Sequence, residues 1–375
     1  MKYVDEFRDP ELAKQVLKRL HEVIASIPRA AERPLQIMEV CGGHTHSIFR
    51  YGLEGLLPQG IEMVHGPGCP VCVLPMGRVD DCIAIAEQPD VIFTTFGDAM
   101  RVPGSKKSLQ QASAEGCDIR MVYSPMDALD IARKHPDKRV VFFGLGFETT
   151  MPATALTLMQ AKRENLRNFF LFCNHITIIP TMKAILDEPG MSIDGFLGPG
   201  HVSMVIGRQP YEFIASEYDR PLVIAGFEPL DILQSLLMVA EQLRDGRAEV
   251  ENQYARIVPD KGNLQAMNAV NTVFEVRDFF EWRGLGSIAE SGVQIRNEYA
   301  DFDAERAFSV ATLKVEDPKS CECGEVLKGS LKPWDCTLFG KSCTPETPVG
   351  ALMVSTEGAC AAYYSYGKID VQRAG

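Results

Sequence analysis

Residues 140–175 read VVFFGLGFETTMPATALTLMQAKRENLRNFFLFCNH. Two short apolar runs, at 140–144 and 169–173, flank a helical stretch at 154–166. The same alternation continues in both directions, and the other apolar runs of strand length lie at 35–40, 61–65, 91–96, 119–123, 193–197 and 221–225. Strands that alternate with helices at this spacing predict parallel sheet covered on both faces.

The expected architecture is α/β, with two similar doubly wound parallel-sheet domains at 31–126 and 127–235. A single eight-stranded barrel is the topological alternative. GFETT at 146–150 is echoed by GFEP at 226–229, each directly after an apolar run, which favours a repeated unit. The alternation stops after residue 230, so 236–375 is expected to form a smaller, mainly helical and irregular iron–sulfur domain. The N-terminal helix within 1–30 is expected to pack against it.

The overall composition excludes several classes of protein. The 375 residues include 38 basic and 50 acidic side chains, for a net charge of −12, which argues against a nucleic-acid partner. No run of 18 apolar residues and no apolar signal region occurs, so we expect a cytoplasmic protein without a membrane span. Eleven cysteines in a reducing compartment favour metal binding or redox chemistry over a disulfide framework.

Polar or glycine-rich motifs follow nearly every predicted strand. Ligands of open α/β sheets bind outside the carboxyl ends of the strands, so these motifs are expected to gather at one cleft. The residues concerned are Cys41, His44, His46, Cys69, Cys72, Asp98, Glu148, His175 and His201. We expect His21, His65 and His135 to be ordinary histidines, because no constellation surrounds them.

The motif CGGHTH at 41–46 combines a thiol with two histidines. Cys41 and His44 are close enough in sequence to reach one transition metal, and thiolate suits iron, copper or zinc. A structural turn with a buried cysteine is about equally compatible with these residues alone. The second histidine and the neighbouring sulfur motif favour a metal site.

The motif GPGCPVC places Cys69 and Cys72 in a Cys-x-x-Cys spacing after a strand. This spacing allows a reversible disulfide, and it is also half of a zinc site. We favour the redox pair, because the cysteine pair that could complete a zinc site lies some 250 residues away and has irregular spacing. A purely structural loop is the third alternative.

Four late cysteines, Cys323, Cys336, Cys343 and Cys360, match the number of ligands of a 4Fe–4S cluster. A structural zinc site also uses four cysteines and remains the alternative. Cys321 is a spare thiol that leaves the identity of the first ligand open.

Three further residues are weaker candidates for the cleft. Glu148 either caps a helix or presents a carboxylate to the cleft. His201 follows Gly198-Pro199-Gly200 and looks positioned rather than buried. Asp98 is better interpreted as a turn residue.

Taken together, several long motifs resemble the HypD family of nickel–iron hydrogenase maturation proteins. They are CGGHTH, HGPGCPVCVLP, FGDAMRVPG, YSPMDAL, GLGFETT, PGHVSMVIG, EWRGLG and EGAC, which span about residues 3–365. The resemblance implies a scaffold on which iron acquires two cyanides and one carbon monoxide. It also implies a HypC-type chaperone as partner and a HypE-type cyanide donor that uses a HypF-derived carbamoyl group.

The resemblance also implies roles for individual residues. Cys41 would hold the iron with a HypC cysteine, His44 would assist, and Cys69 and Cys72 would be the redox pair. The cluster ligands would be Cys323, Cys336, Cys343 and Cys360. Glu148 and His201 have no role that the resemblance supplies. The chain would be a monomer within a hetero-complex, and a redox-active scaffold rather than a stand-alone catalyst.

Two rival hypotheses remain. One is a thiol–disulfide oxidoreductase that uses Cys69 and Cys72 with an iron–sulfur electron relay. The other is a zinc-stabilised binding module.

Overall fold

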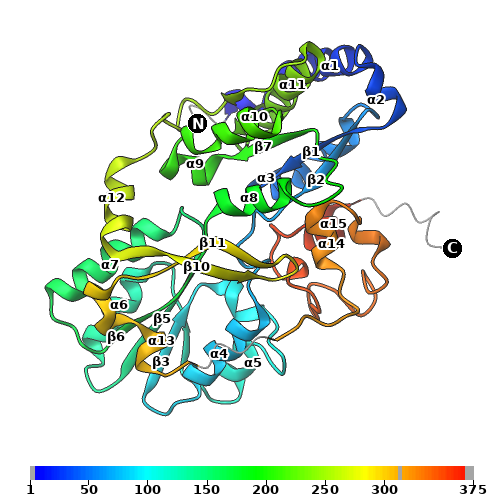
Figure 1. The fold of residues 1–375 in the computed structure, drawn as a ribbon. Helices are drawn as coiled ribbons and strands as arrows, with labels where there is room; N and C mark the ends of the chain where they lie inside the picture. Colours follow the sequence, from blue (N-terminus) through cyan, green and yellow to red (C-terminus); the bar gives the residue numbers. More distant parts are fainter. Residues whose placement is uncertain (1–4, 311–314, 368–375) are drawn as a thin grey trace.

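Two parallel β-sheets form the framework of the protein (Figure 1). The computed structural model describes residues 5–310 and 315–367. Sheet A has the strand order β2-β1-β7-β8-β9, and sheet B has the order β4-β3-β5-β6. The strands are β1 (Leu35–Glu39), β2 (Ile61–His65), β3 (Val91–Thr95), β4 (Ile119–Met121), β5 (Arg139–Gly146), β6 (Phe169–His175), β7 (Gly195–Pro199), β8 (Leu222–Ala225) and β9 (Val250–Asn252). The eight expected strands are therefore confirmed, and among the strands of these two sheets the three-residue β9 was not expected.

Helices cover both faces of both sheets, as a doubly wound fold requires. The helices are α1 (Pro10–Ala25), α2 (Pro28–Glu32), α3 (Gly42–Arg50), α4 (Met76–Ala86), α5 (Leu109–Ala114), α6 (Pro125–Lys134), α7 (Met151–Arg163), α8 (Ile178–Leu186), α9 (Gly200–Ile206), α10 (Glu212–Tyr218), α11 (Pro229–Asp245), α12 (Leu264–Val273), α13 (Ala304–Ala307), α14 (Cys323–Lys328) and α15 (Ala359–Tyr366). In sheet A, α1 and α11 pack on one face and α8 and α10 on the other. In sheet B, α6 and α7 pack on one face and α4 and α5 on the other.

The alternation of side chains along each strand explains this layering. In β1, Leu35 and Ile37 join the core beneath α1 and α11, whereas Met38 joins the core on the opposite face. In β5, Val140 and Phe142 face α6 and α7, and Val141 and Phe143 face α4 and α5. One buried cluster is shared by both sheets, so the two halves are joined through a continuous core.

The two sheets divide the chain differently from the expected ranges. Each of the ranges 31–126 and 127–235 contributes strands to both sheets. The chain leaves sheet A after β2, builds all of sheet B from β3 to β6, and returns through α8 to β7. Parallel strands are joined by long crossovers, so a run of strands and helices does not reveal which strands are neighbours.

The remainder of the chain departs from the strand–helix alternation, as expected. Helix α12 leads from the α9 side of the molecule to α7, and an antiparallel hairpin follows, formed by β10 (Phe274–Trp282) and β11 (Gly286–Ile295). The hairpin was not expected. The segment 315–367, called the C-terminal segment below, contains α14, α15 and irregular chain. Helix α1 packs along α11, and both lie on sheet A rather than on this segment (Figure 1).

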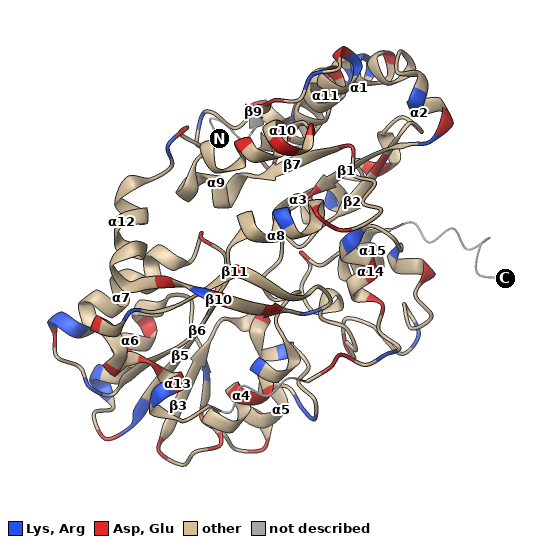
Figure 2. Cartoon of the chain, in the orientation of Figure 1, with Lys and Arg blue, Asp and Glu red and all other residues tan. Residues whose placement is uncertain are grey.

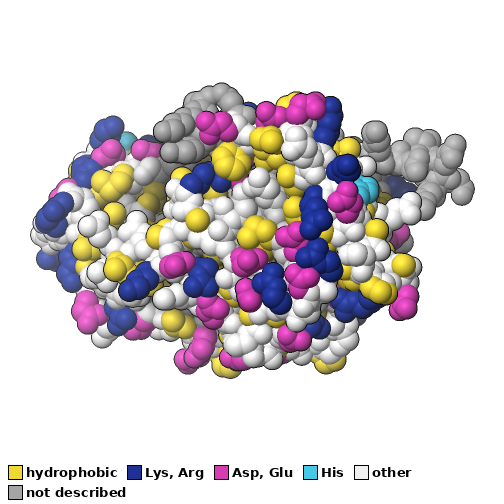
Figure 3. Space-filling view, turned by 90° about the horizontal axis from the view of Figure 1, so that it is seen from above, with side chains coloured by type: hydrophobic (Ala, Val, Ile, Leu, Met, Phe, Trp, Pro, Cys, Tyr) yellow, Lys and Arg dark blue, Asp and Glu magenta, His cyan; other side chains and the backbone are white. Residues whose placement is uncertain are grey.

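Charged residues of both signs are interspersed along the chain (Figure 2). The face seen from above shows the same mixture (Figure 3). Within the described part of the chain, no helix combines the length and the hydropathy that crossing a bilayer requires.

Candidate functional site

Cys41 lies in a tight junction between sheet A and the loop that follows β2. It is the N-cap residue of α3, has an extended backbone and is buried. The backbone N–H of Gly42 donates to the carbonyl of Gly68, 3.0 Å away. A Cβ on Gly68 would lie 2.3 Å from the Cys41 backbone nitrogen, so this contact requires glycine. The motifs CGGHTH and GPGCPVC therefore meet, as the sequence predicted.

Some neighbours of the Cys41 thiol stabilise its thiolate form, and others destabilise it. Burial, followed by the nearby charges of Glu357 and Glu39, raises the pKa of Cys41 to about 12, although the backbone N–H groups of Gly43 and His201 oppose the shift. Glu357 belongs to the C-terminal segment, and its carboxyl oxygen lies against Gly42. A thiolate in this position calls for a cation beside it.

A buried carboxylate anchors the Cys41 turn from behind. Glu39 Oε2 accepts from the backbone N–H of Cys41 at 3.0 Å, and Glu39 Oε1 accepts from the Thr45 hydroxyl. His65 Nδ1 lies 2.8 Å from the same Oε1, and all these side chains are buried. His65, which the sequence analysis expected to lack partners, thus belongs to a buried network with Glu39, which that analysis did not consider.

Two histidines bracket the ring of Phe227. His44 stacks on Phe227 with a centroid distance of 4.9 Å, and His201 stacks on it at 3.9 Å. His44 Nε2 lies 3.1 Å from the carbonyl of Ala225, whereas Nδ1 has no partner among the described residues. Burial lowers the pKa of both imidazoles, which favours the neutral form that can bind a metal. The His201 ring is partly covered by Phe227, but the residue as a whole is exposed, in agreement with its expected position.

Cys69 and Cys72 form a disulfide, with Cα atoms 5.3 Å apart. Both are buried. Gly358 of the C-terminal segment lies against this pair, because a Cβ there would be 3.0 Å from Cys72 Sγ. Cys360 follows two residues later. The disulfide thus lies between the Cys41 turn and the C-terminal segment.

The late cysteines share one small cavity. It is lined by Cys321, Cys323, Cys336, Cys343 and Cys360, with Val326, Leu338, Phe339 and Met353 among the apolar residues. A Cβ on Gly350 would lie 2.4 Å from Cys323 Sγ and 2.6 Å from Cys321 Sγ, so this glycine leaves room for sulfur. In the described chain, no three His, Cys, Asp or Glu side chains converge closely enough for a single metal ion. The cysteines instead surround a cavity.

Glu148 lies apart from the sulfur residues, at the end of sheet B. Its Oε1 accepts from the backbone N–H of Ile178 at 3.0 Å, while Oε2 is buried without a partner in the described chain. Burial raises the pKa of Glu148 to about 7. Burial, and further the charges of Glu148 and Cys41, raise the pKa of Tyr211, whose hydroxyl is hydrogen-bonded to Ser203.

The other sequence candidates have structural roles. His175 is buried between Thr150 and Thr154, and burial lowers its pKa to about 4. Asp98 accepts from the Ser355 hydroxyl at 3.2 Å, which ties the turn after β3 to the C-terminal segment. His46 packs edge-on against Tyr366.

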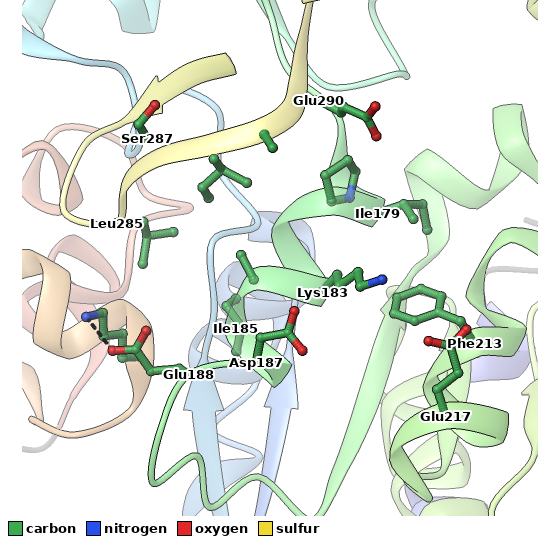
Figure 4. A pocket seen from close by; sticks show the side chains of 15 residues that line it. Ile179, Lys183, Ile185, Asp187, Glu188, Phe213, Glu217, Leu285, Ser287 and Glu290 are labelled. Carbon is green, nitrogen blue, oxygen red and sulfur yellow. Dashed lines mark hydrogen bonds and ion pairs between the residues drawn. The ribbon is translucent and has the colours of Figure 1, made fainter. Parts of the chain in front are cut away.

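A groove of about 700 Å³ lies away from these residues (Figure 4). Helix α8 lines it with Ile179 and Lys183, the hairpin with Leu285 and Glu290, and α10 with Phe213. None of the site residues predicted from the sequence lines it.

The family of the chain follows from comparison with known proteins. A family model described as "HypD: Hydrogenase formation hypA family" matches residues 11–367. The chain belongs to the HypD family. It is 61% identical over 371 residues to the hydrogenase maturation factor HypD of Rhodobacter capsulatus, covering 98% of each chain. It is 58% identical over 366 residues to the hydrogenase maturation factor HypD of Escherichia coli (strain K12), again covering 98% of each chain. The resemblance predicted from the motifs is therefore confirmed for this HypD-family chain.

Proposed function

We propose that this chain is a hydrogenase maturation scaffold on which an iron ion acquires two cyanides and one carbon monoxide. The observation that carries the proposal is the continuous contact between three sulfur sites. Gly68 abuts Cys41, and Gly358 abuts Cys72 and leads directly to Cys360. The Cys41 thiol, the Cys69–Cys72 disulfide and the cysteine-lined cavity are thus neighbours in space, in that order.

The iron is cargo, and Cys41 is the residue we assign to hold it. Cyanide and carbon monoxide are strong-field ligands that favour electron-rich, low-spin iron, and a thiolate donates charge to such a centre. A ferrous ion would replace the proton on Cys41 and offset the carboxylates of Glu39 and Glu357. His44 and His201 are the nearby imidazoles that would assist.

The Cys69–Cys72 pair would supply electrons for attaching the ligands to the iron at Cys41. When Cys69 and Cys72 are reduced to thiols, closing the disulfide again releases two electrons and two protons. A 4Fe–4S cluster in the cysteine cavity would supply or accept single electrons.

The cavity suits such a cluster, because its donors are thiols and Gly350 leaves space beside them. The ligands we assign are Cys323, Cys336, Cys343 and Cys360. Cys323 is in contact with Cys360 as well as with Cys321, whose Sγ is 3.2 Å from that of Cys323. This favours Cys323 over Cys321 as the first ligand.

The scaffold would work in the cytoplasm with other maturation proteins rather than as a stand-alone catalyst. A HypC-type chaperone would contribute a second cysteine to the iron, and a HypE-type protein would deliver cyanide. The relatives are named hydrogenase maturation factors, which supports an assembly role.

The test is infrared spectroscopy of the complex purified with its chaperone. In Cys41→Ala, the cyanide and carbonyl bands should disappear, because the iron loses its thiolate. Cys82→Ala is the matched control, since Cys82 is equally buried but lies in helix α4 outside the motifs, and both bands should remain. Persistence of the bands in Cys41→Ala would exclude this residue as the iron anchor.

The bonded state of Cys69 and Cys72 favours a second candidate, a thiol–disulfide oxidoreductase with an iron–sulfur electron relay. This candidate requires turnover of a disulfide substrate without any partner protein. A zinc-stabilised binding module would instead yield a colourless protein that contains zinc only.

A further inference from the structure

Arg283, at the tip of the β10–β11 hairpin, is a buried cation with one unused donor. Its exposed fraction is 3%. Nε lies 2.6 Å from Asp317 Oδ1, and Nη1 donates to the carbonyl of Pro103 at 3.3 Å. Nη2 is buried and has no hydrogen-bond partner among the residues that the structure describes. Burying a guanidinium costs free energy unless its charge is paired and its N–H groups are hydrogen-bonded. Asp317 pairs with the charge but leaves Nη2 without a hydrogen-bond acceptor.

The same hairpin tip touches both the disulfide loop and the cysteine cavity. The backbone N–H of Arg283 donates to the carbonyl of Val73, the residue after Cys72, at 2.8 Å. The next residue, Gly284, has φ +78°, and a Cβ there would lie 2.8 Å from Gly324 Cα. The tip therefore meets α14 directly beside Cys323 (Figure 1).

Arg283 is a buried cation beside the segment that carries Cys323, because it pairs with Asp317 and its neighbour Gly284 contacts Gly324. A buried cation at this point stabilises extra negative charge on any group that the late cysteines hold.

We propose that Arg283 sets the reduction potential of the 4Fe–4S cluster held by the late cysteines. The guanidinium favours the reduced cluster, which carries one more negative charge, and so makes the cluster a better electron acceptor. Because its backbone is bonded to the disulfide loop, the residue also fixes the cluster segment next to Cys72. This inference rests on the proposed function, because it needs the cluster to be present.

The test is an anaerobic redox titration of the reconstituted full-length protein, followed by visible and electron paramagnetic resonance spectra. Arg283→Gln should lower the midpoint potential, with about a tenfold loss in the equilibrium constant for accepting one electron, or about 59 mV. Arg283→Lys should keep most of the wild-type value. Asp317→Asn should shift the potential upward, because it removes the negative charge paired with Arg283. A purely structural ion pair would not give shifts of opposite sign.

Arg277→Gln is the matched control, since Arg277 lies on the same hairpin but pairs with Glu305. It should leave the potential unchanged. The inference about Arg283 would be overturned if wild type, Arg283→Gln and Asp317→Asn had equal midpoint potentials and full iron and sulfide. The proposed function would not be affected by that result. Wild-type protein that takes up no iron and sulfide would overturn the proposed cofactor as well. Should Arg283→Gln fail to assemble, Asp317→Asn decides: an upward shift supports the inference and no shift overturns it.

Discussion

At the residue scale, the Cys41 turn shows how a buried charge can fix the position of a cysteine. Glu39 is fully buried, yet its carboxylate accepts from the Cys41 N–H and the Thr45 hydroxyl and faces His65. Such a group is tolerated only when it is fully hydrogen-bonded. The carboxylate therefore holds the backbone on both sides of Cys41, which keeps the thiol in place between Gly68 and His201.

The sequence contained one signal for Glu39. In the strand at 35–40, Leu35, Ile37 and Glu39 fall on one face by their period of two, so a carboxylate occupies a core position. Nothing local indicated its partner, because His65 lies 26 residues away on β2. The same reason explains why Arg283 was not predicted: its contacts with Val73, Pro103 and Asp317 arise only from the tertiary fold.

Glu148 provides a pH-dependent prediction. Its folded pKa is raised to about 7, above its ordinary value of 4.5, so the folded protein loses stability as the pH rises from about 4.5 through 7. Glu148→Gln stays neutral and keeps an acceptor for Ile178. We expect this variant to be more stable than wild type by up to about 3 kcal/mol at pH 8 and equal to it near pH 4.

Urea denaturation at the two pH values measures this difference. Glu164→Gln is a suitable control, because Glu164 is exposed and pairs with Arg133, which lowers its pKa to about 2. This control should not gain stability at pH 8. A Glu148→Gln variant with the same advantage at both pH values would show that the carboxylate is not titrating as described.

At the scale of elements, local patterns determined the strands but not their partners. The eight expected apolar runs all became strands, because buried parallel strands are continuous runs of apolar residues. In the chain, all four strands of sheet B lie between β1 and β7. The pairing of β1 with β7 therefore depends on contacts that no short stretch of sequence contains. The β10–β11 hairpin was missed for a related reason, since exposed Val276 and Phe279 obscure the pattern of its first strand.

The close contact between the turn after β1 and the loop after β2 gives a second prediction. Gly68→Ala would place a Cβ 2.3 Å from the Cys41 nitrogen, which the backbone cannot accommodate without moving. We expect a loss of about 1–3 kcal/mol in unfolding free energy and less iron bound at Cys41. Gly55→Ala is the control, because nothing lies within 4 Å of its added Cβ. Equal stability and iron content in the two variants would contradict the tight junction.

At the scale of the whole molecule, the C-terminal segment connects the sites rather than standing apart as a domain. Ser355 bonds to Asp98, Arg101 donates to the carbonyl of Val354, and Tyr363 packs on Phe49 of α3. The segment 315–367 has little regular structure of its own, so we expect it to depend on the proposed 4Fe–4S cluster as an internal staple.

Cys336→Ala tests that dependence. The variant should lose most of its iron and acid-labile sulfide, and protease should cleave 315–367 while the far-ultraviolet signal of the sheets persists. Cys117→Ala is the control, since Cys117 lies outside both cysteine sets and is partly exposed. Full iron and sulfide in Cys336→Ala would remove this residue from the ligand set.

The interleaving of the two sheets has a consequence for the newly made protein. Translation proceeds from the N-terminus, so β1 and β2 leave the ribosome well before β7, with the whole of sheet B synthesised in between. His201 and Phe227, which complete the surroundings of Cys41, emerge later still. Glu357, which lies against Gly42, is made later again, so the iron of the proposed function would be loaded only after the C-terminal segment has been synthesised.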